Sequence, residues 1–266
     1  MESSKLPASC HITPTISNEQ FIPDHIFMYI VTGAITIYDG NKEYHIQSGD
    51  YGFAKRNHLA KYIKQPSVNG PFTAISIFFN QDFLRSFSKE YNYTANNVLS
   101  KEAVIKLPAH PLLNAYIQSL TPYLPLTGNE YDHFISLKKK EIILLLLKIN
   151  PDFKNILFDF GDPGKIDLES FMNQNYRFNV SMKHFSYLTG RSLTTFKRDF
   201  EKIFNTSPGR WLLEKRLQEA RFLIEKKGEK PSDVYLEVGF EDLSHFSYAF
   251  KKRYGISPNQ LKRTYQ

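Results

Sequence analysis

The chain has 266 residues, of which 41% are hydrophobic, 15% aromatic and 23% charged, a composition that excludes long disordered regions and suits two domains. Its longest apolar run, residues 142–147, has six residues, far below the roughly 20 that a membrane-spanning helix needs. The single cysteine, Cys10, and an N-terminus without a basic-then-apolar leader predict a protein of the reducing cytoplasm in which Cys10 is an incidental thiol.

The first hundred residues predict short β-strands. Apolar and polar side chains alternate between turns at Gly33, Gly40 and Gly49, and residues 73–80 continue this alternation. Short strands at this spacing predict a β-sandwich or a small barrel.

Beyond Pro111 the apolar period lengthens and predicts two helices, over residues 111–124 and 132–149. The second helix is apolar on nearly every side, which fits either a core helix or a contact with another chain. Glycine and proline at residues 161–164 mark a boundary between domains at residues 1–160 and 165–266.

The net charge of +7 is concentrated after this boundary. Residues 1–164 contain 15 Lys and Arg against 15 Asp and Glu, whereas residues 165–266 contain 19 against 12. A local basic excess fits a polyanion such as DNA, and a solvated basic face has the same composition. Charge alone leaves both interpretations open.

The C-terminal part contains an internal repeat with a spacing of 50 residues. Each copy has a leucine and two phenylalanines at helical spacing, followed by Ser-Pro: Leu193, Phe196, Phe200 and Ser207-Pro208, then Leu243, Phe246, Phe250 and Ser257-Pro258. The spacing predicts a buried stripe on one helix face, and Ser-Pro predicts the N-cap and first residue of a further helix.

A short helix and a glycine turn precede each stripe, at residues 181–188 with Gly190 and at residues 232–238 with Gly239. Helix, tight turn and helix form a helix-turn-helix unit, so the sequence predicts two such units. The second helix of each unit presents short or basic side chains opposite its stripe, as entry into a DNA groove requires. The side chains that we expect to contact DNA are Arg191, Thr194, Thr195, Lys197, Arg198, Lys202, Ser244, His245, Ser247, Tyr248 and Lys251. Glu241 and Asp242 are expected to cap the second of these helices, because their charge would repel phosphates.

Residues 209–226 predict the helix that connects the two units. Its apolar side chains form a broad face that consists of Trp211, Leu212, Leu217, Ala220, Leu223 and Ile224. A helix of this length spans about 27 Å, near the ~34 Å between successive major grooves, so one chain could contact two adjacent grooves.

Residues 165–266 resemble the DNA-binding domain of AraC/XylS-type transcription regulators. The segment VGFEDLSHFSYAFKKRYGISPNQLKR matches the pattern of the family's second unit, and Arg216 and Ala220 stand at the family's positions on the connecting helix. The resemblance implies a transcription regulator that binds double-stranded DNA, an activator that contacts RNA polymerase. It also implies base contacts from Thr194, Lys197 and Arg198, and from Ser244, His245 and Tyr248.

The N-terminal strands are similar to the cupin-like sensor domain that often accompanies this DNA-binding domain. No metal is expected, because His25, His45 and His58 stand isolated and lack the His-x-His spacing of a cupin site. The family resemblance implies a homodimer through Ile142, Leu145 and Leu146, with a small molecule or a protein as effector. A cupin-type enzyme with a basic helical appendage is the alternative, but it would need a metal triad or a nucleophile and base that are absent from the sequence pattern. We therefore expect a non-enzymatic α+β protein of two domains.

Overall fold

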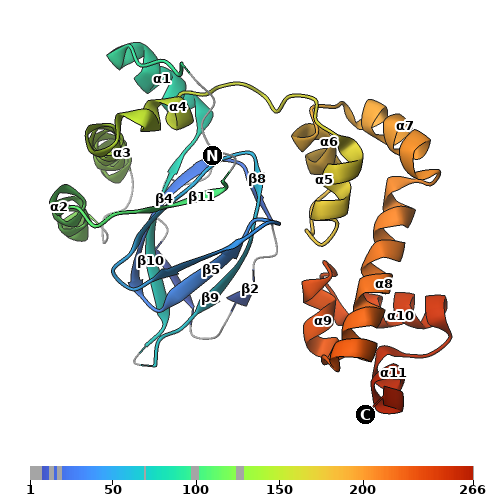
Figure 1. The fold of residues 1–266 in the computed structure, drawn as a ribbon. Coiled ribbons are helices and arrows are strands. Elements are labelled where there is room, and N and C mark those ends of the chain that lie inside the picture. The colour runs from blue at the N-terminus through green and yellow to red at the C-terminus, as the bar shows by residue number, and fades with distance from the viewer. Residues whose placement is uncertain are drawn as a thin grey trace. The chain divides into compact units, whose positions relative to one another are not determined.

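The computed structural model describes residues 8–11, 15–16, 20–68, 70–96, 102–123 and 129–265. The chain divides into two compact units, of which the first comprises Met1–Ser17 and Ile22–Gly161, and the second Asn18–Phe21 and Asp162–Gln266. The first is rich in β-strands and the second is helical (Figure 1). The expected α+β fold class with a helical C-terminal domain is confirmed.

A five-stranded sheet and a four-stranded sheet form most of the β-structure in the described part of the first unit. In the larger sheet the strand order is β1 (Ala8–His11), β10 (Phe72–Phe79), β4 (His25–Thr32), β7 (Tyr51–Ala54) and β11 (Val104–Leu107). In the smaller sheet it is β2 (Thr15–Ile16), β9 (Lys61–Gln65), β5 (Ala34–Tyr38) and β6 (Glu43–Gln47). Neighbouring strands in both sheets are antiparallel, and β3 (Phe21–Ile22) pairs with β8 (His58–Leu59).

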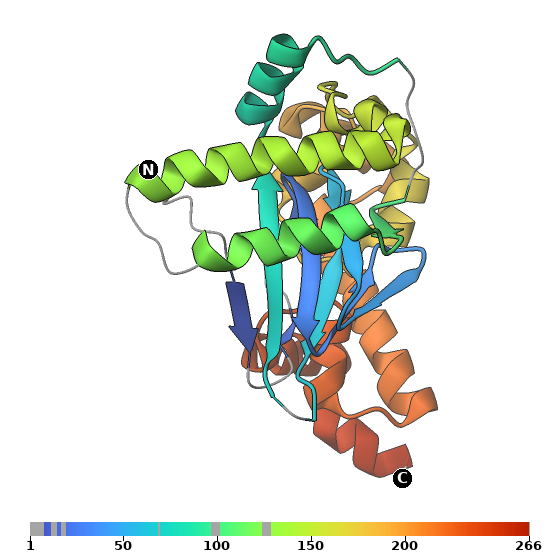
Figure 2. The ribbon, with the colours of Figure 1, turned by 90° about the vertical axis from the view of Figure 1, so that its left-hand side faces the viewer.

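The larger sheet is buried on both faces, because successive side chains of a strand point in opposite directions. On β4, Phe27 belongs to a core shared with helices, whereas Met28 and Ile30 belong to a core shared with the smaller sheet. The helical layer consists of α1 (Gln81–Tyr91), α2 (Pro111–Leu120), α3 (Asn129–Ile149) and α4 (Lys154–Leu157). Helices α2 and α3 run side by side across this sheet (Figure 2).

Helix α1 differs from the sequence-based expectation of strands and turns throughout the first hundred residues. Asn80 caps it by accepting a 2.9 Å hydrogen bond from the backbone N–H of Phe83. Leu84 and Phe87 are its buried side chains, at the i, i+3 spacing of one helix face. The cap and this spacing were the sequence features that could have indicated the helix.

Helix α3 shows that two of the three expected dimer residues face inward. Ile142 and Leu146 are 0% and 1% exposed and lie in the core, while Leu145 is partly buried against it. Ile142 and Leu146 therefore cannot contact a second chain without unfolding this layer, whereas the expected contact at Leu145 stays a prediction. One side of the helix packs on the sheet, and among its described side chains the exposed apolar ones are Phe134, Leu137 and Leu144.

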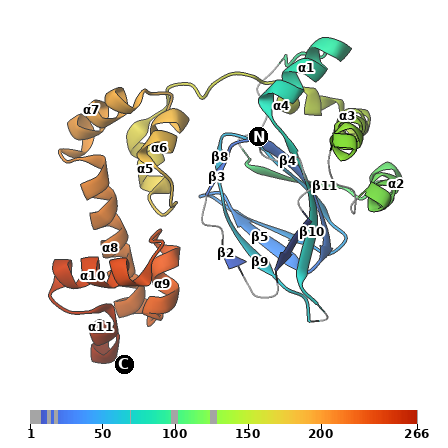
Figure 3. The same ribbon diagram turned by 180° about the vertical axis from the view of Figure 1, so that it is seen from behind.

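The second unit is made of seven helices in its described part. They are α5 (Leu168–Asn175), α6 (Met182–Leu188), α7 (Leu193–Phe204), α8 (Pro208–Lys227), α9 (Pro231–Glu237), α10 (Leu243–Tyr254) and α11 (Pro258–Tyr265). Helix α8 connects the group α5–α7 to the group α9–α11 (Figure 3). Its 20 residues span about 30 Å at 1.5 Å per residue.

The two ends of α8 pack in two different hydrophobic cores. Near its start, the Trp211 ring lies 5.6 Å from that of Phe200 and 4.7 Å from that of Phe204. Farther along, Leu217 and Leu223 pack with Phe246 and Phe250. All six side chains of the expected apolar face are buried. The helix is therefore a shared structural element of both helix-turn-helix units.

Candidate nucleic-acid interface

Helix α7 is the second helix of the first unit. Ser192 caps it by accepting a hydrogen bond from the backbone N–H of Thr195, at 3.2 Å. Phe196 and Phe200 are completely buried, as their spacing predicts, but Leu193 is 39% exposed. Leu193 is the first helical residue, where the side chain extends past the end of the core, so the expectation of a buried Leu193 was wrong.

The turn before α7 requires glycine. Gly190 has a φ of +64°, and a Cβ there would lie 2.4 Å from the carbonyl carbon of Gly164. The turn is held further by Thr189, whose buried hydroxyl donates to the carbonyl oxygens of Phe185 and Ser186 on α6. These contacts fix the direction in which α7 leaves the turn.

Arg191 was expected to contact DNA, but the structure commits its guanidinium to the protein. It donates to the carbonyl oxygens of Thr189 at 2.7 Å and Ile166 at 2.9 Å, and to Asp199 at 3.2 Å. Its side chain is only 7% exposed. The hydrogen bond from Arg191 also keeps the pKa of Asp199 below its ordinary value. Arg191 therefore connects the turn to α7.

The other side chains of α7 that we expect to contact DNA lie on its outer face. Thr194, Lys197 and Lys202 are exposed, and the side chain of Arg198 is 65% exposed despite an ion pair with Asp199 at 3.6 Å. Thr195 is partly buried, and its hydroxyl accepts a hydrogen bond from Ser192. This face carries positive charge with few carboxylates to neutralise it.

Helix α10 occupies the same place in the second unit. Asp242 caps it through a 2.6 Å bond from the backbone N–H of His245, as expected, whereas Glu241 accepts a bond from Asn179. Leu243, like Leu193, is 39% exposed, which corrects the expectation of a buried side chain there. Four of the five expected DNA contacts on α10 are exposed, namely Ser244, His245, Tyr248 and Lys251. The fifth, Ser247, is partly buried.

Arg216 on α8 has a structural role that the sequence did not indicate. Its guanidinium donates to the carbonyl oxygens of Tyr176 at 2.8 Å, Phe178 at 2.8 Å and Gly239 at 2.9 Å. Burial lowers the pKa of Arg216 to about 10. Gly239 has a φ of +96°, and a Cβ there would lie 2.5 Å from the backbone carbonyl oxygen of Arg177, so glycine is needed at the second turn as well. Through these hydrogen bonds, Arg216 links the segment after α5 to the turn of the second helix-turn-helix unit.

The three isolated histidines of the first unit occupy unlike positions. His25 is 3% exposed on β4, His45 is exposed on β6, and His58 hydrogen-bonds through Nδ1 to the carbonyl oxygen of Arg56. In the described part of the chain, no three His, Cys, Asp or Glu side chains gather as metal ligands would.

The side chain of Cys10 lies outside the described residues. No helix among the described residues is long and apolar enough to cross a membrane.

Comparison with known proteins agrees with this geometry. A helix-turn-helix domain family matches residues 186–264, and the ExsA N-terminal regulatory domain family matches residues 25–156. The virulence regulon transcriptional activator VirF of Yersinia enterocolitica is 24% identical over 95% of this chain and 93% of its own length. The regulator ExsA of Pseudomonas aeruginosa is 23% identical over 96% and 92%, and the thermoregulatory protein LcrF of Yersinia pestis 23% identical over 95% and 94%.

The chain belongs to the AraC family of transcription regulators. It is a DNA-binding transcription regulator with a regulatory domain before its two helix-turn-helix units. Its relatives are named as transcription regulators, which favours this interpretation over that of an enzyme with a basic appendage.

Proposed function

We propose that this AraC-type regulator is a transcriptional activator whose helices α7 and α10 enter two successive major grooves of its operator. The observation that carries the proposal is the pair of exposed polar helix faces at the two ends of one rigid helix, α8. A rod of about 30 Å approaches the ~34 Å spacing between successive grooves. The relative VirF is a transcriptional activator by name, which supports activation over repression.

We assign the strongest base contacts to α7. Arg198 and Lys197 are long, exposed donors that can bond to guanine edges, and Thr194 is short enough to lie against a base. On α10, Ser244, His245 and Tyr248 would contact bases, and Lys251, with Lys202 on α7, would bind phosphates. The exposed Leu193 and Leu243 at the two helix starts suit contact with thymine methyl groups. Arg191 is left out of this set because the protein itself satisfies its guanidinium.

We further propose that residues 1–160 form the sensor and dimerisation domain and that residues 165–266 form the DNA-binding domain. A homodimer would bring two DNA-binding domains to direct repeats, with RNA polymerase bound alongside. We place the contact on the exposed side of α3, around Leu137 and Leu144, in place of the buried Ile142 and Leu146. The effector would be a small molecule or a protein partner.

Operator binding tests the base contacts. Binding sites would be mapped genome-wide with the purified protein, and affinities then measured on operator variants with single-base changes. Arg198→Ala should lose about 1–3 kcal/mol of binding free energy and relax specificity at one base pair. Lys89→Ala, on the exposed side of α1, removes an equal charge and should leave specificity unchanged.

Two results would contradict these assignments. Uniform weakening of Arg198→Ala on every operator variant would make Arg198 a phosphate contact. An operator footprint confined to a single major groove would exclude simultaneous entry of α7 and α10.

A further inference from the structure

The chain that leads into the second unit packs on the turn of the first helix-turn-helix unit. Residues 162–166, the linker segment, precede α5 and form neither helix nor strand (Figure 1). At the start of this segment, the Tyr187 hydroxyl on α6 donates a 3.1 Å hydrogen bond to Oδ1 of Asp162. At its end, Arg191 donates to the carbonyl oxygen of Ile166 at 2.9 Å. The first helix-turn-helix unit therefore holds both ends of the linker segment.

The middle of the linker segment lies directly against the turn glycine. A Cβ on Gly190 would lie 2.4 Å from the carbonyl carbon of Gly164 and 2.5 Å from the backbone nitrogen of Lys165. The two backbones thus meet with no room for a side chain between them. The ammonium of Lys165 also lies 4.0 Å from the carboxylate of Asp199 on α7, although an exposed ion pair of this kind contributes little by itself. The linker segment contacts α6, the turn and α7.

The second helix-turn-helix unit has the same arrangement, but a different part of the chain supports its turn. There the turn glycine, Gly239, lies against the carbonyl oxygen of Arg177. Arg216 donates to the carbonyl oxygens of Tyr176 and Phe178, on either side of that residue. This supporting segment follows α5 and belongs to the second compact unit itself. The first turn instead rests on the chain that arrives from the first compact unit, so α7 and α10 differ in what supports them.

The first compact unit holds the chain immediately before the linker segment. Arg56, which is 9% exposed, donates to the carbonyl oxygens of Asp159 at 2.7 Å and Gly161 at 2.9 Å. The backbone N–H of Arg56 in turn donates to Nδ1 of the buried His25 at 3.2 Å. The carbonyl of Gly161 is thus held by the first unit, and the side chain of Asp162 by the second. One peptide bond separates these two anchored points.

We propose that the linker segment is a positioning element of α7. This role rests on the proposed entry of α7 into a major groove, and a passive tether would not have it. Because the linker segment holds Gly190 and Arg191, it fixes the direction in which α7 leaves the turn. That direction places Lys197 and Arg198 at the base edges. The first unit thereby has a covalent route to the base contacts of α7, and α10 has no equivalent.

Two insertions of one glycine into the full chain test this role, because both lengthen the linker equally. The inner insertion, between Gly164 and Lys165, shifts the chain by about 3.8 Å inside the linker segment, so the contacts at its two ends cannot both be kept. The outer insertion, between Gly161 and Asp162, falls between the two anchored points and leaves the linker segment in place. A passive tether would respond equally to both insertions.

Hydrogen–deuterium exchange without DNA measures the effect on the turn, because exchange reports local opening of the backbone. The inner insertion should speed exchange in residues 186–199, which cover the first turn and the start of α7. Exchange should not change in residues 236–249, the equivalent part of the second helix-turn-helix unit 50 positions later. The outer insertion should match wild type in both peptides. Equal exchange in the two insertion variants would overturn the proposal whether or not α7 enters a groove.

Operators with single-base changes measure the effect on base contacts. The inner insertion should lower discrimination in the DNA segment bound by α7 at least about fivefold, the lower end of what one bidentate base contact contributes. Discrimination in the segment bound by α10 should stay at the wild-type level, and the outer insertion should change neither. An equal loss in both segments would show general damage to the DNA-binding domain and would also overturn the proposal.

A second pair of variants tests the same contact without changing the length of the chain. Asp162→Ala and Asp162→Asn both remove the charge, but only asparagine keeps an oxygen that can accept the hydrogen bond from Tyr187. Exchange in residues 186–199 should be faster in Asp162→Ala and close to wild type in Asp162→Asn. Wild-type exchange in Asp162→Ala would contradict the proposal even if the inner insertion fails to fold, which thermal unfolding reveals.

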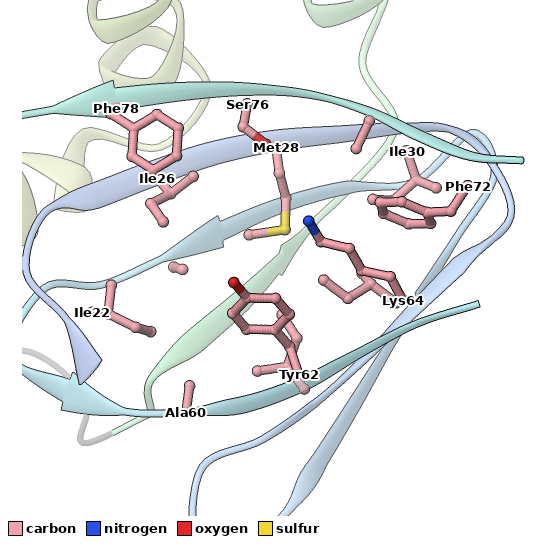
Figure 4. A pocket seen from close by; sticks show the side chains of 14 residues that line it. Ile22, Ile26, Met28, Ile30, Ala60, Tyr62, Lys64, Phe72, Ser76 and Phe78 are labelled. Atoms are coloured by element: carbon pink, nitrogen blue, oxygen red, sulfur yellow. The ribbon is translucent and has the colours of Figure 1, made fainter. Parts of the chain in front are cut away.

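Ile30→Val controls for a general loss of stability in the first unit. Ile30 is 0% exposed and lines an apolar cavity of about 160 Å³ in that unit, whose lining side chains Figure 4 shows. Removal of one methyl group there destabilises the first unit without touching the linker segment. Exchange in residues 186–199 should remain at the wild-type level. Faster exchange in this control would mean that the turn responds to any destabilisation of the first unit, and would overturn the specific role of the linker segment.

Discussion

At the scale of single residues, the printed sequence identified which side chains are basic and near the turns, but not which of them the protein uses internally. Arg191 and Arg198 lie seven residues apart and look equally suited to DNA. The carbonyl oxygens of Thr189 and Ile166 decide between them, because they bind Arg191 and leave Arg198 exposed. Ile166 lies 25 residues before Arg191, so no local pattern indicates this bond.

His25 predicts a dependence of stability on pH. Burial, followed by the charge of Arg56, lowers its pKa to about 3, against 6.5 when unperturbed. Between these values the unfolded chain binds a proton that the folded chain does not, so stability is lost as pH falls through this range. From pH 7 to pH 5 the first unit should lose roughly 2 kcal/mol of unfolding free energy.

Urea unfolding at both pH values measures this loss. Far-UV circular dichroism follows both units, and fluorescence of the single tryptophan, Trp211, follows the second unit separately. His25→Asn should remove the loss, since an amide does not titrate, whereas His45→Asn at an exposed position should preserve it. An equal acid sensitivity in wild type and His25→Asn would refute the role of His25.

At the scale of elements, most helices could be predicted because their periodicity and caps are local. The apolar face of α8 and the Asp242 cap were both predictable from spacing. Helix α1 was missed because it follows directly on the long strand β10, where the alternating pattern dominates. The sequence of α3 does not show which of its sides is buried. Apolar residues occur on nearly every side, and only the tertiary packing decides which side meets the sheet.

The exposed side of α3 gives a prediction about assembly. Leu137→Glu places a charge on a side chain that is 62% exposed, so the chain should remain folded but become monomeric if this side forms the dimer contact. Leu146→Glu should instead unfold the first unit, because it buries an unpaired carboxylate in the core. Light scattering coupled to size exclusion measures the mass, with Val68→Glu as an exposed control. A dimer of unchanged mass in Leu137→Glu would place the contact elsewhere.

At the scale of the whole molecule, the charge asymmetry predicts how DNA binding responds to salt. If about five of the exposed cations of α7 and α10 neutralise phosphates, the logarithm of the binding constant should fall with a slope of roughly −4.5 against the logarithm of salt concentration. That slope corresponds to a loss of several hundredfold between 50 and 200 mM salt.

Fluorescence anisotropy with a labelled operator gives this slope directly. Lys202→Ala should reduce its magnitude by about one, and Lys89→Ala on α1 should not change it. A slope near zero would contradict phosphate neutralisation by these helices.

Helix α8 has a consequence for the arrangement of the operator. Because a core encloses each of its ends, α10 cannot turn about the axis of α8 independently of α7. One added base pair rotates a DNA site by about 35°, and one added helical residue rotates α10 by about 100°. Neither change compensates for the other. The helical phase between the two contacted segments should therefore be selected as strictly as their base sequence, and an operator with correct bases at the wrong phase should be bound through one helix alone.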